Sequence, residues 1–445
     1  MKTIEATYYD TRNLRLTRAG VEVRRSAAEW VATLPTGDVH FPGAADVPAE
    51  LRALLVAYTG GRDLEACARV TIERDRWHLA DDGTVLADVL SDQLTARPIG
   101  ERTARLRSWQ ETAVRPRGDT PAARKQIVKR LGRSGWPTTR PRNPLATFTG
   151  VGPTTIELGR KPSVGQVLGK YLSDQVVALR VADVALRRGE PEGVHDLRVA
   201  VRRIRTCLRV FAQYFRPKPV ARLRTELEWL FGVLGDARDV EVLRARITGA
   251  LHALPDELVL GPVTAELDRL LAKREARTGS AMHDAMTDAR YLALLDLLEN
   301  IPCRPAAKKR AKKALRKRIR TSFRKLRGSV EEASRASGPE HDVALHSVRK
   351  KAKRLRYACE VAEPVLGKSA KRIKRGSKKI QRVLGEHHDS VEVRATLREL
   401  GSRSHLDGSN GFTFGLLHGQ VSERARSQEA EFSQEWRALA KIADQ

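Results

Sequence analysis

The hydrophobic pattern divides the 445-residue chain into two parts with different periods. Residues 1 to about 115 contain short alternating segments, among them TIEATYYDT, VEVRR, EWVATLP and ARVTIERDRWHLA, which are separated by Gly, Asp and Asn turn signals. One helical stretch, PAELRALLVAYT, interrupts them. From Ser163 onward, apolar residues recur at helical spacing almost to the C-terminus. The pattern predicts an α+β protein, with an antiparallel β domain at 1–115 and an all-α region at 163–440.

The segment between these two parts, residues 116–162, is rich in Pro, Gly and Arg, as in RPRGDTP and SGWPTTRPRNP. Such composition is typical of a linker because Pro and Gly interrupt regular structure. One short amphipathic helix is predicted within it, near Ala122 to Leu131.

The helical half contains an internal repeat. A histidine is followed at the third, seventh, eighth and tenth positions by basic residues, first as His195, Arg198, Arg202, Arg203 and Arg205, then as His346, Arg349, Lys353, Arg354 and Arg356. A second phrase recurs in the same order, as VLGDARDVEVL and then VLGEHHDSVEV, with its glycine 40 and 39 residues after the histidine. We therefore expect a duplicated helical unit, with repeat 1 at about 163–300 and repeat 2 at about 305–440.

The repeated phrase places its basic residues on one side of a helix. At about 100° per residue, offsets 0, +3, +7 and +10 fall within an arc of about 80°, and they span about 15 Å. The apolar residues between them lie toward the other side and are predicted to face a core: Leu197, Val201, Ile204, Leu208 and Phe211. A cationic stripe of this length can contact several phosphates in a row, and each arginine can bind bidentately.

The overall charge points to an anionic partner. The chain has 82 Lys and Arg against 54 Asp and Glu, which gives a net charge of +28. Its four cysteines have no paired spacing, as expected in a reducing compartment. No apolar run reaches the length of a membrane span, and the first residues lack the hydrophobic stretch of a signal peptide. We expect a cytoplasmic protein without a membrane partner.

Two further segments add cationic helix faces. Lys308 to Arg327 contains Arg320 and Arg324, and a later segment contains Lys378 and Arg382. These four side chains are further candidates for phosphate binding. The alternative is that such runs are merely solvated faces, since Lys and Arg are good helix formers. For the two histidines the alternative is a role in helix packing.

The phrase GEHHD invites a metal-site interpretation, which the helix geometry disfavours because adjacent side chains diverge by about 100°. Asp389 with Glu392 instead resembles a capping box after a glycine stop. Asp239 in the first copy has a similar capping role or pairs with a stripe arginine. The aromatic residues near the first copy are predicted to lie in the core: Phe211, Tyr214, Phe215 and Trp229.

The pattern H-x-x-R-x-x-x-[RK]-[RK]-[IL]-R, present twice and followed each time by LG…D, resembles the CHAD domain, the conserved-histidine α-helical domain. The likeness runs from about Pro162 to Ala440 and includes FTFGLLHG near the C-terminus. It implies two four-helix bundles, related by pseudo-twofold symmetry, around a basic cavity. It also implies binding of inorganic polyphosphate by the ten residues of the two stripes, and association with polyphosphate granules.

The N-terminal part resembles a CYTH domain, the triphosphate-tunnel fold, through YYDTRNLRLTRAGVEVRR, the tryptophan strand that ends in LP, and LADVLSDQLTA. The resemblance implies phosphate contacts from Arg24, Arg69 and Arg74, and a divalent metal held by glutamates. The sequence departs from that pattern. The opening E-x-E-x-K strand would lie upstream of TIEATYYDT, Thr33 stands in place of a lysine, and Ala113 and Arg115 replace two of the three late carboxylates beside Glu111. We therefore expect a degenerate tunnel that holds Mg²⁺ or Mn²⁺ poorly.

Three functions remain open. The leading hypothesis is a non-catalytic polyphosphate-binding protein that needs no cofactor. The first alternative is a CYTH-type triphosphatase with a CHAD module for polyphosphate, which would need Mg²⁺ or Mn²⁺. The second alternative is a general polyanion or nucleic-acid binder, although aromatic residues make up only 5% and no recognised nucleic-acid motif accompanies the basic helices.

Overall fold

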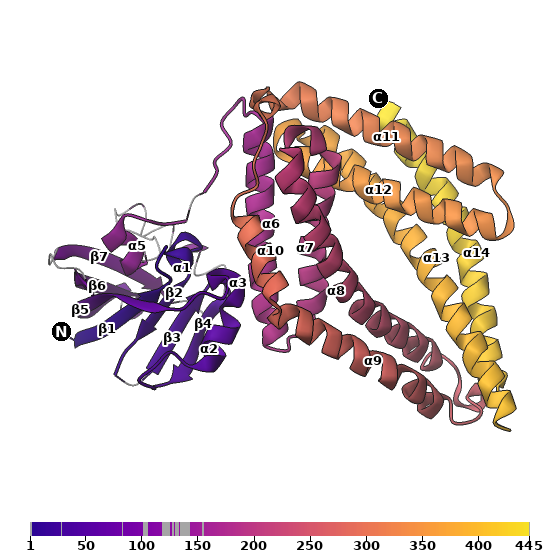
Figure 1. Ribbon diagram of the computed structural model, residues 1–445, viewed down its shortest axis with the longest axis horizontal. Coiled ribbons are helices and arrows are strands. Elements are labelled where there is room, and N and C mark those ends of the chain that lie inside the picture. The colour runs from indigo at the N-terminus through magenta and orange to yellow at the C-terminus, as the bar shows by residue number, and fades with distance from the viewer. Residues whose placement is uncertain are drawn as a thin grey trace. The chain divides into compact units, whose positions relative to one another are not determined.

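The computed structural model describes residues 2–27, 29–81, 83–100, 106–117, 125–126, 129, 133, 143–153 and 155–444. The chain forms two compact units, Met1–Thr155 and Ile156–Gln445. The first contains an antiparallel sheet and the second is helical, as Figure 1 shows for each unit taken by itself. The predicted fold class is therefore confirmed.

The first unit is built on one seven-stranded sheet with the order β4-β3-β2-β1-β5-β6-β7. Every neighbouring pair is antiparallel. The sheet fits a CYTH-like tunnel. Its strands are β1 (Lys2–Asp10), β2 (Glu22–Arg25), β3 (Glu29–Leu34), β4 (Gly37–Pro42), β5 (Glu65–Asp81), β6 (Thr84–Pro98) and β7 (Arg107–Pro116).

Short helices accompany this sheet: α1 (Arg15–Arg18), α2 (Ala49–Leu54), α3 (Val56–Thr59) and α5 (Pro144–Thr149). Asn143 caps α5, and its side-chain amide donates to the carbonyl of Val21. Leu145 and Phe148 of α5 pack with the apolar side chains of β1, β5 and β6. The segment 143–153 is thus part of the first unit. The short helix expected near Ala122 to Leu131 lies outside the described residues, apart from isolated positions.

The YYDT motif has a structural role that starts at Asp10, the last residue of β1. Its fully buried carboxylate accepts hydrogen bonds from the backbone N–H groups of Thr11, Leu16 and Thr17 and from the hydroxyl of Thr17. The first turn of a helix leaves N–H groups without intrahelical partners, and this carboxylate satisfies those of Leu16 and Thr17 in α1. The motif therefore fixes the turn between β1 and β2.

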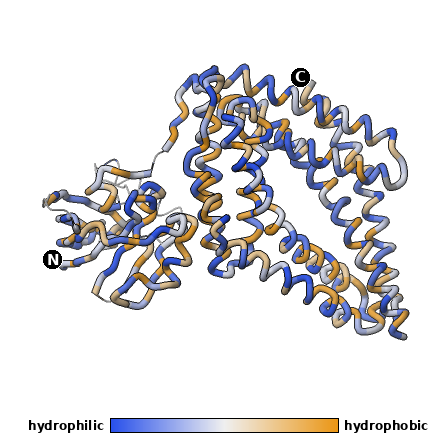
Figure 2. Tube along the Cα trace, viewed as in Figure 1, coloured by the Kyte–Doolittle hydropathy of each residue, from blue (hydrophilic) through white to orange (hydrophobic). Residues whose placement is uncertain are grey.

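The second unit contains nine of the described α-helices. Its first helix begins at Val164, and the preceding residue, Ser163, forms a reciprocal capping box with Gln166. Along the longer helices, hydrophobic and hydrophilic residues alternate with the helical period (Figure 2). The helices are α6 (Val164–Arg187), α7 (Gly193–Val210), α8 (Pro217–Leu251), α9 (Val263–Thr287), α10 (Ala289–Glu299), α11 (Ala311–Arg335), α12 (Gly338–Leu366), α13 (Lys368–Leu406) and α14 (Phe412–Asp444).

The predicted apolar face of α7 is confirmed. Leu197, Val201, Ile204, Leu208 and Phe211 are all buried, at 1% exposure or less. Of the four aromatic residues expected in the core, Phe211, Tyr214 and Phe215 are buried. Trp229 is the exception. It is only partly buried, and the guanidinium of Arg290 lies over its ring with its carbon 4.3 Å from the ring centroid.

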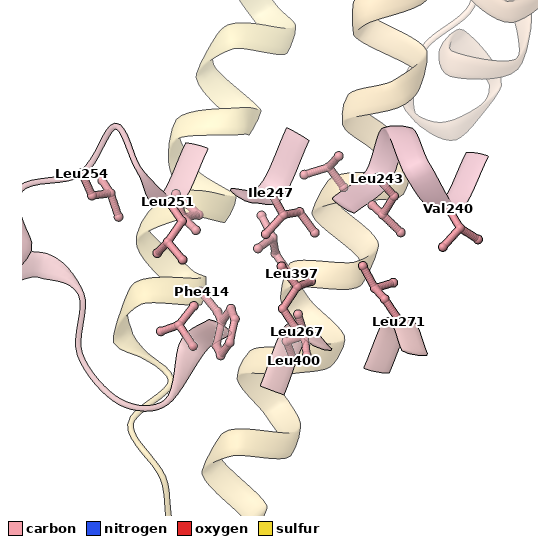
Figure 3. Packing of buried hydrophobic residues seen from close by; sticks show 13 residues of the cluster. Val240, Leu243, Ile247, Leu251, Leu254, Leu267, Leu271, Leu397, Leu400 and Phe414 are labelled. Atoms are coloured by element: carbon pink, nitrogen blue, oxygen red, sulfur yellow. The ribbon is translucent and has the colours of Figure 1, made fainter. Parts of the chain in front are cut away.

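Two regions join the first and second halves of the helical unit. Helices α7 and α12, which carry the two cationic stripes, contact each other. Farther along, the ends of α8 and α9 pack against α13 and α14 through an apolar cluster that includes Ile247, Leu267, Leu397 and Phe414, and that we call the tip cluster (Figure 3). These apolar contacts hold α8 and α13 at a fixed separation from one another, because large buried side chains resist displacement.

Helices α8 and α13 run without interruption through the second repeated phrase. Gly235 and Gly385 lie in mid-helix, and Asp389 and Glu392 follow within the same helix. The expected glycine stop with a capping box is therefore wrong. A single glycine costs a helix only about 1 kcal/mol, which the packing of such long helices outweighs.

Candidate functional site

A cavity of about 640 Å³ lies in the helical unit, between α7 and α8 of the first copy and α12 and α13 of the second. Its lining contains nine arginines and lysines against four carboxylates. The cations are Arg198, Arg202, Arg205, Arg209, Arg238, Arg349, Lys350, Lys353 and Arg354, and the carboxylates are Glu228, Asp239, Asp389 and Glu392. This excess of positive charge in a concave site focuses the potential and favours an anionic ligand.

The structure brings eight of the ten stripe residues to this cavity: His195, Arg198, Arg202, Arg205, His346, Arg349, Lys353 and Arg354. The other two, Arg203 and Arg356, do not line the cavity. Arg203 forms an ion pair with Glu360 (Nε to Oε1, 3.1 Å), and Arg356 donates to Gln381 (Nη1 to Oε1, 2.7 Å). Both lie about 80° from their histidine around the helix, at opposite edges of the stripe, so the packing of each helix decides which edge faces the cavity.

The second repeated phrase positions the first arginine of each stripe. Arg198 donates through Nη1 to the carbonyl of Gly235 (3.1 Å) and to Asp239 Oδ1 (2.9 Å). In the second copy, Arg349 lies over Gly385 and its Nη2 is 3.7 Å from Asp389 Oδ1. The glycine leaves the helix surface bare, so the guanidinium can lie flat against it, and the aspartate four residues later holds the charged end. The expectation that Asp239 pairs with a stripe arginine is confirmed.

The two copies also meet inside the cavity. Arg202 of α7 donates through Nε to the hydroxyl of Tyr357 of α12 (2.9 Å). Within the second copy, the rings of His346 on α12 and His388 on α13 lie with their centroids 4.2 Å apart. Neither contact was predicted, because each joins residues on different helices, 155 and 42 positions apart in the chain.

Sequence reasoning missed several lining residues that a wider search of the same helix face would have found. Lys350, Tyr357 and Arg209 stand at offsets +4, +11 and +14 from their histidines, which are about 40°, 20° and −40° around the helix. All three positions lie within about 40° of the histidine, on the arc of the predicted stripe or just beside it. Arg238 and His388 belong to the second repeated phrase and reach the cavity from α8 and α13.

Burial and crowding of charge perturb the protonation of this cavity. Burial, followed by the charges of Arg349, Arg202 and Arg198, lowers the pKa of Lys353 from its ordinary 10.5 to about 7. Burial, with a further contribution from His388, lowers the pKa of His346 from 6.5 to about 4. Lys353 and His346 therefore hold fewer protons than the composition of the cavity suggests, and an anion bound beside them would favour proton uptake.

The described residues contain no group of three or more His, Cys, Asp or Glu side chains that could hold a metal ion. Asp389, beside the two adjacent histidines, is instead paired with Arg246 (Nη2 to Oδ2, 2.8 Å) and lies near Arg349. Three of the cavity carboxylates, Glu228, Asp239 and Asp389, thus pair with arginines.

The further cationic candidates lie outside the cavity lining. Arg320 and Arg324 are exposed on α11, and Lys378 is exposed on α13. Arg382 is also exposed and pairs with Glu386 and Glu431 of the same bundle.

The arginine candidates on the sheet have partners of their own. Arg24 forms an ion pair with Glu22 (2.9 Å) and donates to Thr33, and burial raises the pKa of Glu22. Arg74 binds Asp92 bidentately, with both N···O distances at 2.7 Å. Arg69 is exposed on β5. Two of the three expected phosphate contacts are therefore held by carboxylates.

None of the described helices combines the length and the apolar character needed to cross a bilayer.

Three comparisons with known proteins agree with this architecture. The family model described as CHAD domain matches residues 170–398. Two Mycobacterium tuberculosis proteins, the uncharacterized proteins MT2285 (strain CDC 1551 / Oshkosh) and Rv2226 (strain ATCC 25618 / H37Rv), are each 31% identical over 99% of this chain and 91% of their own length.

Among solved structures, the chain is similar in fold to PptA from Streptomyces chartreusis, with a TM-score of 0.51 and 24% identity over 62% of this chain and 99% of that one. It is also similar to the CHAD domain from the plant Ricinus communis, with a TM-score of 0.50 and 24% identity over 65% of this chain and 96% of that one.

Proposed function

Because the chain belongs to the CHAD domain family, we propose that it binds inorganic polyphosphate in the cavity between α7, α8, α12 and α13, and that it does so without catalysing a reaction. The proposal places the protein in the cytoplasm, in association with polyphosphate granules.

The observation that carries this proposal is the convergence of cations from both copies of the repeat in one cavity. His195 and Arg209, at opposite ends of the α7 stripe, are 14 residues apart, which corresponds to about 21 Å of helix. A linear anion lying along this stripe would meet one guanidinium per helical turn. The lining has nine basic side chains and four carboxylates, so the carboxylates are too few to pair with every basic side chain. Arginine suits such a ligand because its planar fork binds phosphate oxygens bidentately.

The central test removes four charges in the middle of the cavity, by changing Arg198, Arg202, Arg349 and Lys353 to Glu together. A matched control changes four exposed cations, Lys317, Arg320, Arg324 and Lys378, to Glu. Each variant replaces four basic side chains by glutamate, so the two differ chiefly in where in the molecule the charge is changed. We expect the cavity variant to lose polyphosphate binding. The control should lose only the part of the affinity that comes from long-range attraction between the positively charged protein and the anion. Equal affinities in the two variants, measured by calorimetric titration at moderate salt, would refute the assignment.

A salt titration gives a second, independent readout. Binding that neutralises several phosphates releases their counterions, so the logarithm of the affinity falls linearly with the logarithm of the salt concentration. The slope for the wild-type chain should exceed the slope for the cavity variant by several units. Circular dichroism of both variants shows whether they keep the helical fold.

The alternative function is metal-dependent triphosphate hydrolysis by the sheet. The ion pairs of Arg24 with Glu22 and of Arg74 with Asp92 count against it, because they occupy the guanidinium groups that a triphosphate would need. Hydrolysis of tripolyphosphate with Mg²⁺ or Mn²⁺ is the direct assay. Turnover that Glu111→Ala abolishes would establish this activity.

The second alternative, general binding of nucleic acid, is tested by competition between polyphosphate and duplex DNA at equal phosphate content. Preference for polyphosphate supports the cavity, because a space of about 640 Å³ is small compared with a duplex, whose major groove alone is about 12 Å wide. Equal competition would indicate a general polyanion binder.

A further inference from the structure

One of the contacts between the two copies of the repeat has no equivalent when the copies are exchanged, and this breaks the symmetry of the cavity. Every stripe residue of the first copy has its counterpart 151 positions later. Arg203 of α7 thus corresponds to Arg354 of α12, and Arg209 of α7 corresponds to Glu360 of α12. Exchanging the copies therefore converts the pair Arg203–Glu360 into the pair Arg354–Arg209.

The first of these pairs is satisfied. Arg203 Nε lies 3.1 Å from Glu360 Oε1, and that carboxylate also accepts a hydrogen bond from the hydroxyl of Tyr171 on α6 (3.1 Å). Both arginine and glutamate are turned away from the cavity, and neither belongs to its lining. This contact joins α7, α12 and α6 without contributing free charge.

The counterpart pair consists of two cations, and both line the cavity. The positive charges of Arg209 and Arg205 add to burial in lowering the pKa of Arg354, so the three guanidinium groups are close enough to repel one another. Within the described part of the chain, neither Arg209 nor Arg354 forms an ion pair with a carboxylate. Arg205 has one, with the exposed Glu228 (Nη2 to Oε1, 3.3 Å), and it lies over the ring of Phe231 at 4.5 Å from the centroid.

The carboxylates of the cavity are concentrated around the other end of the stripes. Asp239, Asp389 and Glu392 come from the second repeated phrases of α8 and α13, beside the arginines nearest the two histidines. The lining is thus graded. The arginines around Asp239 and Asp389 are compensated, whereas Arg205, Arg209 and Arg354 have, among the described residues, Glu228 as their one carboxylate partner.

The negative charge of a linear polyphosphate is also distributed unevenly, with more on the ends than on the internal units. Each internal phosphate carries one ionisable oxygen, whereas a terminal phosphate has a second, whose pKa is about 6 in related phosphate esters. At pH 8 the chain end therefore has about twice the charge of an internal unit.

We propose that Arg205, Arg209 and Arg354 form a subsite for the doubly charged terminal phosphate, so that the cavity holds one end of a polyphosphate chain in a defined direction. This inference rests on the proposed function, since it assigns a preference within the same cavity. The terminal phosphate supplies Arg354 with the negative charge that Glu360 supplies to Arg203, and it contacts Arg354 of one copy and Arg209 of the other.

The test compares a short linear polyphosphate of uniform length with the same chain capped at both ends as phosphoramidates, which removes the second ionisable oxygen. Dissociation constants are measured by calorimetry at pH 8 and fixed salt. We expect the wild-type chain to prefer the uncapped form about tenfold, which is the value of one charge-assisted hydrogen bond. In Arg209→Glu the preference for the uncapped chain should fall to the smaller value that the extra charge of the uncapped ends gives by itself. The reason is that the new carboxylate would pair with Arg354, as Glu360 pairs with Arg203.

Arg354→Glu provides a second variant with the same expected result, since Arg209 would then have the carboxylate partner. Arg222→Glu is the matched control, because Arg222 is exposed on α8 and does not line the cavity. It should keep the preference of the wild-type chain. An unchanged preference in both Arg209→Glu and Arg354→Glu would overturn the inference.

Three further outcomes separate the inference from the proposed function and from a simpler ligand. If the wild-type chain binds no polyphosphate of any length, the proposed function fails, and the inference fails with it. If the wild-type chain binds long chains but does not discriminate between capped and uncapped ends, only the inference fails. Inorganic phosphate at the same concentration should not compete away the end preference. If it does, the subsite is specific for free phosphate and the assignment to a chain end is wrong.

Discussion

Lys353 should act as a proton acceptor when an anion enters the cavity. Its pKa in the empty cavity is about 7, because burial and the charges of Arg349, Arg202 and Arg198 disfavour the ammonium form. A polyanion reverses the balance of nearby charge and returns this pKa toward its ordinary value of 10.5. Binding and protonation of Lys353 are therefore linked.

The size of the effect follows from these two pKa values. At pH 8, Lys353 is about 9% protonated in the empty cavity and nearly fully protonated beside the ligand, so binding should take up about 0.9 proton. The same linkage lowers the affinity as the pH rises. Between pH 7 and pH 9 the loss should reach about 50-fold, before the ionisation of the ligand itself is counted.

The stability of the protein without ligand should change with pH in the opposite direction to the affinity. Because the pKa of Lys353 is lower in the folded chain than in the unfolded chain, the unfolded chain binds more protons between pH 7 and pH 10.5. Stability therefore rises with pH through this window, by up to about 5 kcal/mol for the full shift. Lys353→Met should remove this contribution, which chemical denaturation at pH 7 and pH 9 measures.

Calorimetric titration of polyphosphate in buffers with different ionisation enthalpies counts the protons taken up. Lys353→Arg keeps the positive charge and cannot lose it, so its proton uptake at pH 8 should be smaller than that of the wild-type chain by about 0.9. Lys350→Arg is the matched control, since Lys350 also lines the cavity but is exposed. The reasoning is refuted if Lys353→Arg takes up as many protons as the wild-type chain.

Three further substitutions test separate parts of the structure. Gly235→Ala should raise the free energy of unfolding by up to about 1 kcal/mol through helix propensity, because the new Cβ would lie 3.5 Å from the guanidinium of Arg198 and would not clash with it. Gly235→Leu should instead displace that guanidinium and weaken polyphosphate binding about tenfold. Ile247→Ala in the tip cluster should lower the free energy of unfolding by about 2–5 kcal/mol, and a loss below 1 kcal/mol in a denaturant titration would contradict the packing. Asp10→Asn should cost about 1–3 kcal/mol, because an amide cannot accept all the hydrogen bonds that this buried carboxylate accepts, and thermal unfolding that matches the wild-type chain would count against its role in fixing α1.

Local periodicity accounts for most of what could be predicted. The helical period alone separates His195, Arg198 and Arg202 from Leu197 and Val201, and the structure places the first set in the cavity and the second in the core. The start of the helical unit at Ser163 was likewise readable, because a capping box involves residues only three apart. These features depend on the backbone geometry of one segment.

Contacts between distant segments could not be predicted in this way. The aspartate of the second phrase looked like a capping residue because a glycine precedes it, whereas Asp239 in fact orients Arg198 from a neighbouring helix. Nothing in the local pattern distinguishes Arg203, which pairs with Glu360, from Arg354, which lines the cavity, since they are equivalent positions of the repeat.

The amino-acid sequence by itself determined that a sheet precedes a helical unit, that the helical unit is duplicated, and that each copy carries a cationic stripe opposite an apolar one. These properties follow from side-chain order along a helix or strand of known period. Only the tertiary structure decided that the stripes face one cavity, that carboxylates compensate the arginines around Asp239 and Asp389 and not those at Arg209, and that Lys353 sits among arginines with a pKa of about 7. Such outcomes depend on distances between helices that are far apart in the chain, and these distances are set by the packing of all their apolar faces together.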